Sequence, residues 1–76
     1  MSYQVYRFRI HLTARECREY YKGLFTSIQV QTYNGLRLQL PAHRIRPFIT
    51  PSGVEGLFEL KVDKNNKFIS LQKIAN

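Results

Sequence analysis

The sequence has a single cysteine, no tryptophan and no apolar run near the ~20 residues of a membrane-spanning helix. Because Cys17 has no second cysteine to pair with, an internal disulfide is excluded, which suits the reducing cytoplasm. The first residues lack the shape of a signal peptide. We therefore expect a cytoplasmic protein with no membrane span.

Sequence signatures of catalysis are also missing. No Gly-x-Ser-x-Gly elbow, Walker loop or dinucleotide-binding fingerprint occurs. Glu55 and Glu59 lie four strand residues apart, or about 13 Å, which exceeds the roughly 5–9.5 Å that paired carboxylates need for glycoside hydrolysis. His11, His43 and Cys17 lack the spacing of a zinc site. We expect no enzyme, no metal, no cofactor and no small-molecule substrate.

The clearest structural signal is a β-hairpin over Ser27–Leu40, where apolar and polar residues alternate on both arms. A two-residue turn at Asn34 and Gly35 would pair core residues with polar ones. A three-residue loop over 33–35, with Gly35 in the left-handed region, keeps the apolar residues on one face. The predicted pairs are Thr32 with Leu36, Val30 with Leu38 and Ile28 with Leu40.

The N-terminal part predicts one strand and one short helix. Tyr3–Leu12 alternates between apolar and polar residues, as a half-buried strand does. Thr13 and Glu16 form a capping box at the start of the helix, and Gly23 fits its end. Apolar residues spaced three and four apart predict a helix face that packs on the sheet. These residues are Ala14, Cys17, Tyr20, Tyr21 and Leu24.

The C-terminal half predicts an irregular segment and a second hairpin. Pro41–Gly53 holds all three prolines and favours a turn or a single helical turn, with Ile45 and Phe48 in the core. A strand over Val54–Val62 then leads to a tight turn at residues 65–66, both asparagines. This turn pairs Val62 with Ile69 and Leu60 with Leu71. It leaves an apolar face that needs a cover, made of Leu57, Phe68 and Ile74.

The element order is β-α-β-β-β-β within a single domain, residues 1–76. We expect the α+β class: a strongly twisted antiparallel sheet, or a small partly open barrel of SH3-like or Sm-like size, with one short helix. An RRM-type fold fits less well because the sequence has no second amphipathic helix.

Positive charge is the one functional signal, since twelve lysines and arginines stand against five acids for a net charge of +7. This balance favours nucleic acid, anionic lipid or an acidic protein as partner. Cations two residues apart on a strand project about 6.6 Å apart, near the spacing of successive phosphates. We expect nucleic-acid binding, RNA before DNA, by phosphate neutralisation with limited stacking. The candidate residues are Arg7, Arg9, His11, Arg37, Arg44, Arg46 and Tyr33.

Two alternatives stay open. The basic side chains also fit a purely solubilising role, and Arg44 and Arg46 fit ion pairs with Glu55 or Glu59 that would hold the irregular segment. The rival function is a protein-interaction module. It would dock an acidic protein, or a second copy of itself, through an exposed strand edge or the uncovered apolar face.

Several short motifs resemble a family of short gammaproteobacterial proteins known only as a domain of unknown function. They are Tyr6-Arg7-Phe8, Tyr20-Tyr21-Lys22-Gly23, Arg46-Pro47-Phe48-Ile49-Thr50, Gly53-Val54-Glu55-Gly56 and Asn65-Asn66-Lys67-Phe68. The resemblance covers nearly the whole chain and implies a complete single-domain bacterial protein. It implies no activity, cofactor or binding residue.

Overall fold

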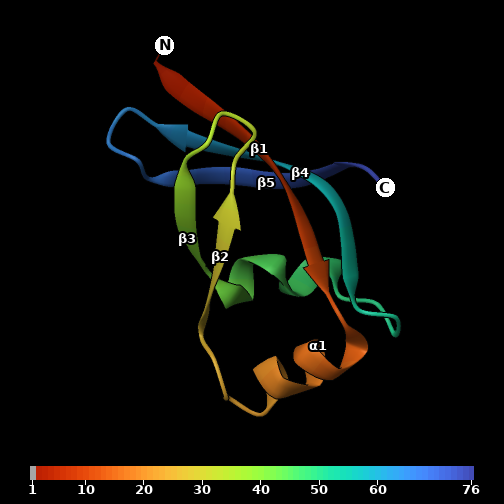
Figure 1. Cartoon of the computed structure of the whole chain (residues 1–76). Helices are drawn as coiled ribbons and strands as arrows, with labels where there is room; N and C mark the ends of the chain where they lie inside the picture. Colours follow the sequence, from red (N-terminus) through yellow and green to blue (C-terminus); the bar gives the residue numbers. More distant parts are fainter. Residues whose placement is uncertain (1) are drawn as a thin grey trace.

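The computed structural model describes residues 2–76 and contains five strands, one α-helix and one 3-10 helix (Figure 1). The elements follow in the order β1 (Tyr3–Leu12), α1 (Ala14–Tyr21), β2 (Ser27–Gln31), β3 (Arg37–Pro41), η1 (Ala42–Phe48), β4 (Val54–Asp63) and β5 (Phe68–Ala75). The predicted order of strands and helix and the α+β class are confirmed. The segment after Pro41, for which the sequence predicts a turn or a single helical turn, forms a 3-10 helix of seven residues.

The strands form two antiparallel sheets, one with the order β1-β4-β5 and one made of β2 and β3. The sequence predicts a single strongly twisted sheet or a small partly open barrel, whereas the strands of residues 2–76 form two separate sheets and no closed barrel. The sheets approach each other at β1, where Tyr33 N, just past β2, donates to Arg7 O at 3.0 Å. Figure 1 shows the β2–β3 hairpin beside β1, with α1 at the end of the molecule away from the N-terminus.

The core lies between the two sheets and is closed by η1. Phe8 and Phe58 are fully buried and come from neighbouring positions of β1 and β4. Ile45 of η1 is also fully buried, and the Phe48 ring meets the Phe58 ring edge-on with centroids 5.0 Å apart. The predicted placement of Ile45 and Phe48 in the core is therefore confirmed.

The β2–β3 hairpin has the predicted register. Val30 pairs with Leu38 and Ile28 with Leu40, and Thr32 N donates to Leu36 O at 2.8 Å. Gly35 has a φ of 89°, a backbone conformation that residues with a side chain rarely adopt. This conformation allows the three-residue loop, which keeps the apolar residues of both strands on the core side.

The β4–β5 loop differs from its prediction and repeats the geometry of the first hairpin. Asp63 N donates to Lys67 O at 2.9 Å, which leaves a three-residue loop with Asn66 at a φ of 64°. The Asp63 carboxylate accepts hydrogen bonds from the backbone N–H groups of Asn65 and Lys67 at 2.8 and 2.9 Å. These bonds favour the longer loop over the predicted tight turn.

The longer loop changes the register near the turn. Val62 pairs with Phe68, so the predicted pair of Val62 with Ile69 is wrong; a register shift follows, and Leu60 pairs with Leu71 as predicted. Phe68 consequently packs against the core cluster, whereas Ile69 is exposed. The predicted apolar outer face of Leu57, Phe68 and Ile74 therefore does not form, since it loses Phe68.

The capping box of α1 is confirmed in both directions. Glu16 N donates to Thr13 Oγ1 at 3.1 Å, and Thr13 N donates to the Glu16 carboxylate at 2.9 Å. Cys17 is buried, but Tyr21 and Leu24 are mostly exposed, so the predicted apolar face is too long. The helix ends at Tyr21, and Leu24 therefore leaves the helical period that the prediction assumed.

Candidate nucleic-acid interface

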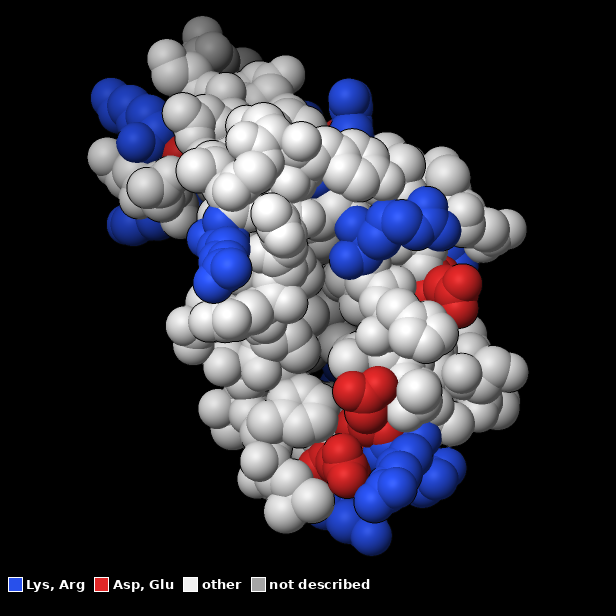
Figure 2. Space-filling model, in the orientation of Figure 1, with Lys and Arg blue, Asp and Glu red and all other residues white. Residues whose placement is uncertain are grey.

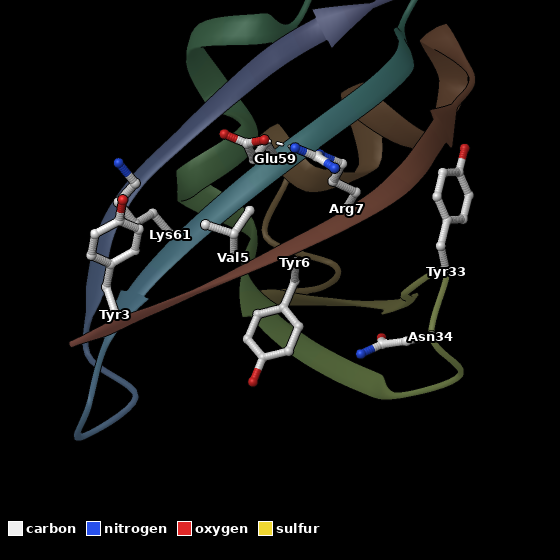
Figure 3. A pocket seen from close by; sticks show the side chains of 8 residues that line it. All are labelled: Tyr3, Val5, Tyr6, Arg7, Tyr33, Asn34, Glu59 and Lys61. Carbon is white, nitrogen blue, oxygen red and sulfur yellow. Dashed lines mark hydrogen bonds and ion pairs between the residues drawn. The ribbon is translucent and has the colours of Figure 1, made fainter.

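A groove of about 410 Å³ lies between the first half of β1 and the β2–β3 loop (Figure 3). We call it the tyrosine groove. Tyrosines and cations supply most of its lining, and one carboxylate lies among them: Tyr3, Tyr6, Arg7, Tyr33, Glu59 and Lys61. Figure 3 shows Tyr3 and Tyr33 far apart on either side of the groove, with Arg7 between them. Aromatic rings interleaved with cations are typical of surfaces that bind single-stranded nucleic acid.

The loop that carries Tyr33 is held by its own hydrogen bonds. Gly35 N donates to Thr32 O at 3.0 Å, and Leu36 N donates to Thr32 Oγ1 at 3.0 Å. Thr32 is buried, and its hydroxyl also donates to the Asn34 side-chain oxygen. Together with the bond from Tyr33 N to Arg7 O, this network fixes Tyr33 next to β1.

Both outer tyrosine rings are available for contact. Tyr3 is 51% exposed and Tyr33 is 66% exposed. Lys61 Nζ lies 4.5 Å from the centroid of the Tyr3 ring, a cation–π contact at the end of the groove. Neighbouring Val5 pairs with Lys61 across β1 and β4, which explains why the lysine reaches this side of the sheet.

The three candidate cations of β1 differ in their pairing. Arg7 Nε lies 3.0 Å from a Glu59 carboxylate oxygen, and His11 Nδ1 lies 3.0 Å from a Glu55 oxygen. Both pairs join residues directly opposite each other on β1 and β4. Arg9 lies opposite a leucine and has no carboxylate within 4.0 Å in the described part of the chain. Arg9 is thus the β1 cation whose charge is free for an external phosphate.

The five acids are all engaged within the molecule. Glu55 and Glu59 pair with β1, Glu19 lies 3.7 Å from Arg15, Glu16 completes the capping box, and Asp63 holds the β4–β5 loop. Among residues 2–76, Arg7 and Arg15 are the only lysines or arginines with a carboxylate within 4.0 Å. Most of the positive charge is therefore uncompensated.

Arg44 and Arg46 lie on η1 and do not line the tyrosine groove. Their guanidinium carbons lie 3.9 Å from the Phe68 ring centroid and 5.7 Å from the Tyr21 ring centroid, respectively. The ion pairs with Glu55 or Glu59 that the sequence suggests are not formed, because those carboxylates pair with β1.

Arg37 is exposed at the start of β3, opposite Gln31, and does not line the tyrosine groove either. Figure 2 shows the basic side chains of one face in separate patches with uncharged surface between them. The candidate set therefore divides: Arg7 and Tyr33 share a groove, Arg9 and His11 lie farther along β1 outside its lining, and Arg37, Arg44 and Arg46 lie elsewhere.

Tyr3 and Lys61 are groove residues outside the set of candidates that the sequence predicts. Tyr3 begins the alternating strand, and the alternation places its side chain on the same face as Arg7, so the sequence pattern could have indicated it. Lys61 reaches the groove only through the β1–β4 pairing, which no local pattern contains.

The other groups that could carry chemistry are the thiol of Cys17 and the histidine and acidic side chains. Burial, together with nearby Glu16, raises the pKa of the Cys17 thiol above its usual value. No cluster of three histidine, cysteine or acidic side chains suited to a metal ion occurs among residues 2–76. No helix in that same range is long and apolar enough to cross a membrane.

Fold and site together define a small basic α+β domain with an aromatic, cation-lined groove. Residues 4–74 match the family described as "Protein of unknown function (DUF2835)", and the chain belongs to this family. The resemblance to a domain of unknown function seen in the sequence is thereby confirmed. No curated protein and no solved structure matches the chain.

Proposed function

We propose that the protein binds single-stranded nucleic acid, RNA before DNA, in the tyrosine groove. The observation that carries the proposal is the pair of exposed rings, Tyr3 and Tyr33, on either side of a groove that also holds Arg7 and Lys61. Four strand residues separate Tyr3 from Arg7, or about 13 Å, which spans two to three nucleotides. Stacked bases and neutralised phosphates would then account for binding without sequence specificity.

Each side chain has a distinct role in this proposal. Tyr3 and Tyr33 stack on bases, and Lys61 neutralises a phosphate within the groove with release of counterions. Arg9, two residues past Arg7 on β1 and outside the groove lining, neutralises a further phosphate. Asn34 also lines the groove; its side-chain oxygen accepts a bond from Thr32, and its NH₂ group remains a donor for a ribose 2′-hydroxyl or a base edge. The donor toward a 2′-hydroxyl favours RNA over DNA. Glu59 opposes binding because it faces Arg7 within the groove.

The test is fluorescence anisotropy with a labelled single-stranded RNA decamer at several salt concentrations. Tyr33→Ala should lower affinity by roughly 5- to 150-fold, the equivalent of about 1–3 kcal/mol per stacked base, with no change in salt slope. Tyr33→Phe should retain affinity because the ring remains. Arg9→Ala should lower affinity and reduce the slope by about 0.7, the contribution of one phosphate on a single strand.

Arg18→Ala is the matched control, since Arg18 is an exposed arginine of α1 with no carboxylate within 4.0 Å in the described chain. It removes the same charge away from the groove. Equal losses of affinity in Arg9→Ala and Arg18→Ala would mean that net charge alone drives binding. Unchanged affinity in Tyr33→Ala would mean that RNA does not bind in the tyrosine groove.

A second candidate function is self-association along β5. This strand lies at the edge of its sheet and exposes Ile69 and Ile74, and exposed edges of this kind pair with other strands. Two register shifts in the β4–β5 ladder weaken the case, because bulges distort an edge against regular pairing. Sedimentation over a hundredfold concentration range tests this function. A dimer that dissociates more readily in Ile74→Lys would support it, and a monomer at every concentration would exclude it.

A further inference from the structure

A second groove, which we call the Arg44 groove, lies between β3 and the β4–β5 loop. Its volume is about 450 Å³, within the roughly 300–1,000 Å³ of typical ligand sites. Tyr6, Leu60 and Val62 supply its apolar floor, Leu38–Pro41 one wall, and Arg44 its positive charge. It shares only Tyr6 with the tyrosine groove.

The wall formed by β3 has the character of an open strand edge. Four consecutive residues, Leu38–Pro41, line the groove, although side chains along a strand alternate between faces. An occupant that contacts all four must therefore lie along the edge of the strand. In the described chain β3 pairs with β2 alone, so its other edge has no strand partner. An extended peptide binds such an edge by main-chain hydrogen bonds.

Arg44 provides an unpaired positive charge at one end of the groove. Its Nε is buried and has no hydrogen-bond partner, and no carboxylate lies within 4.0 Å of its guanidinium among residues 2–76. The guanidinium lies over the Phe68 ring, and these two residues also line the next hollow, beside Phe48 and Leu71. The stacked pair is thus shared by the two hollows and lies between them.

We propose that the Arg44 groove binds the C-terminus of an extended peptide. The peptide backbone pairs with the free edge of β3, and its last apolar side chain packs on Tyr6, Leu60 and Val62. The terminal carboxylate pairs with the Arg44 guanidinium, whose planar fork matches a carboxylate. A chain end fits better than an acidic side chain within a longer peptide, because a chain that continues would have to pass over the stacked Arg44 and Phe68 side chains.

The experiment is an amide-shift titration of the full ¹⁵N-labelled chain with two peptides. The first is N-acetyl-Thr-Val-Thr-Val-Leu with a free carboxylate, and the matched ligand is the same peptide with a C-terminal amide. The free acid should give saturable shifts at the amides of Leu38, Gln39 and Leu40 and at Arg44 Nε–H. The amide should bind at least tenfold more weakly, or about 1.4 kcal/mol.

Arg44→Met should remove the preference for the free acid, because methionine keeps an apolar chain against Phe68 but has no charge. Arg46→Met is the control: Arg46 belongs to the same 3-10 helix and lies over Tyr21, so its loss should leave the preference intact. The comparison of the two peptides on the unaltered chain stands even if a variant misfolds.

Three results would overturn the proposal. The first is the absence of saturable shifts along β3 at millimolar peptide. The second is equal affinity for the free acid and the amide. The third is saturation of the same amides by octanoate but not by the peptide, which would assign the groove to small amphipathic acids.

Discussion

The close approach of the turn at residues 50–53 to the β1–α1 junction makes Gly53 the most sensitive glycine of the chain. Thr50 and Gly53 bond to each other twice through their backbones, at 2.9 Å in each direction. Gly53 has a φ of 105°, and a Cβ built on it would lie 2.1 Å from Leu12 O and 2.9 Å from the carbonyl carbon of Thr13. Both atoms belong to backbone, so a rotamer change does not relieve the overlap.

Gly53→Ala should therefore destabilise the protein by two separate costs. A non-glycine residue at positive φ costs roughly 1–2 kcal/mol, and forcing an atom into a filled space costs about 1–3 kcal/mol more. The free energy of unfolding expected for a chain of this length is only about 4–11 kcal/mol. The variant should lose about 2–5 kcal/mol, which shifts the urea midpoint strongly or unfolds the chain outright.

Gly35→Ala is the matched control. Gly35 also has a positive φ, 89°, but an added Cβ there meets nothing within 4 Å. Its cost should be the conformational part alone, roughly 1–2 kcal/mol. Urea unfolding followed by far-UV circular dichroism measures both variants against the natural chain. Equal losses in the two variants would mean that the turn does not lie against the end of β1.

Two further predictions concern charge. Glu59→Gln frees Arg7 and should raise the affinity for single-stranded RNA several-fold and steepen the salt slope by about 0.7; Glu19→Gln removes the same charge from α1, and an equal gain there would contradict a local effect. Burial raises the pKa of Cys17, so the native state favours the neutral thiol. The resulting contribution to the free energy of unfolding is full below the unfolded pKa of about 8.5. It is lost as pH rises through the raised pKa of the native state. Ellman's reagent at pH 8 should react far more slowly with the native chain than in 6 M urea, and equal rates would contradict the assignment.

Local chemistry explains the features that the sequence predicts correctly. In the first hairpin only one register keeps the apolar residues together, and Gly35 supplies the required backbone conformation at the required position. The capping box depends on Thr13 and Glu16 three residues apart, a relation within one turn of helix. Such features need no information from the rest of the chain.

The second hairpin was mispredicted because its pattern fits two registers. Phe68 and Ile69 are both apolar, so either one next to Val62 keeps the core filled. Asn65 and Asn66 both tolerate positive φ, and the choice falls to hydrogen bonds of the Asp63 carboxylate. The outcome depends on a side-chain-to-backbone contact that periodicity does not contain.

The candidate site was predicted only in part because it depends on contacts between distant segments. The neutralisation of Arg7 by Glu59 requires the β1–β4 register, which joins residues 52 positions apart. The same register brings Lys61 beside Tyr3. The basic residues are evident from the sequence, but the pairing of strands decides which of them are free and which share a groove.

The central proposal, nucleic-acid binding in the tyrosine groove, is tested most directly by mapping where RNA touches the protein. The measurement is an amide-shift titration of the ¹⁵N-labelled chain with a short single-stranded RNA, at low and near-physiological salt. Binding in the tyrosine groove should give salt-sensitive, saturable shifts clustered on Tyr3–Arg9, on residues 33–35 and on Lys61. No shifts at low salt, where electrostatic binding is strongest, or shifts confined to η1 and α1, would contradict it.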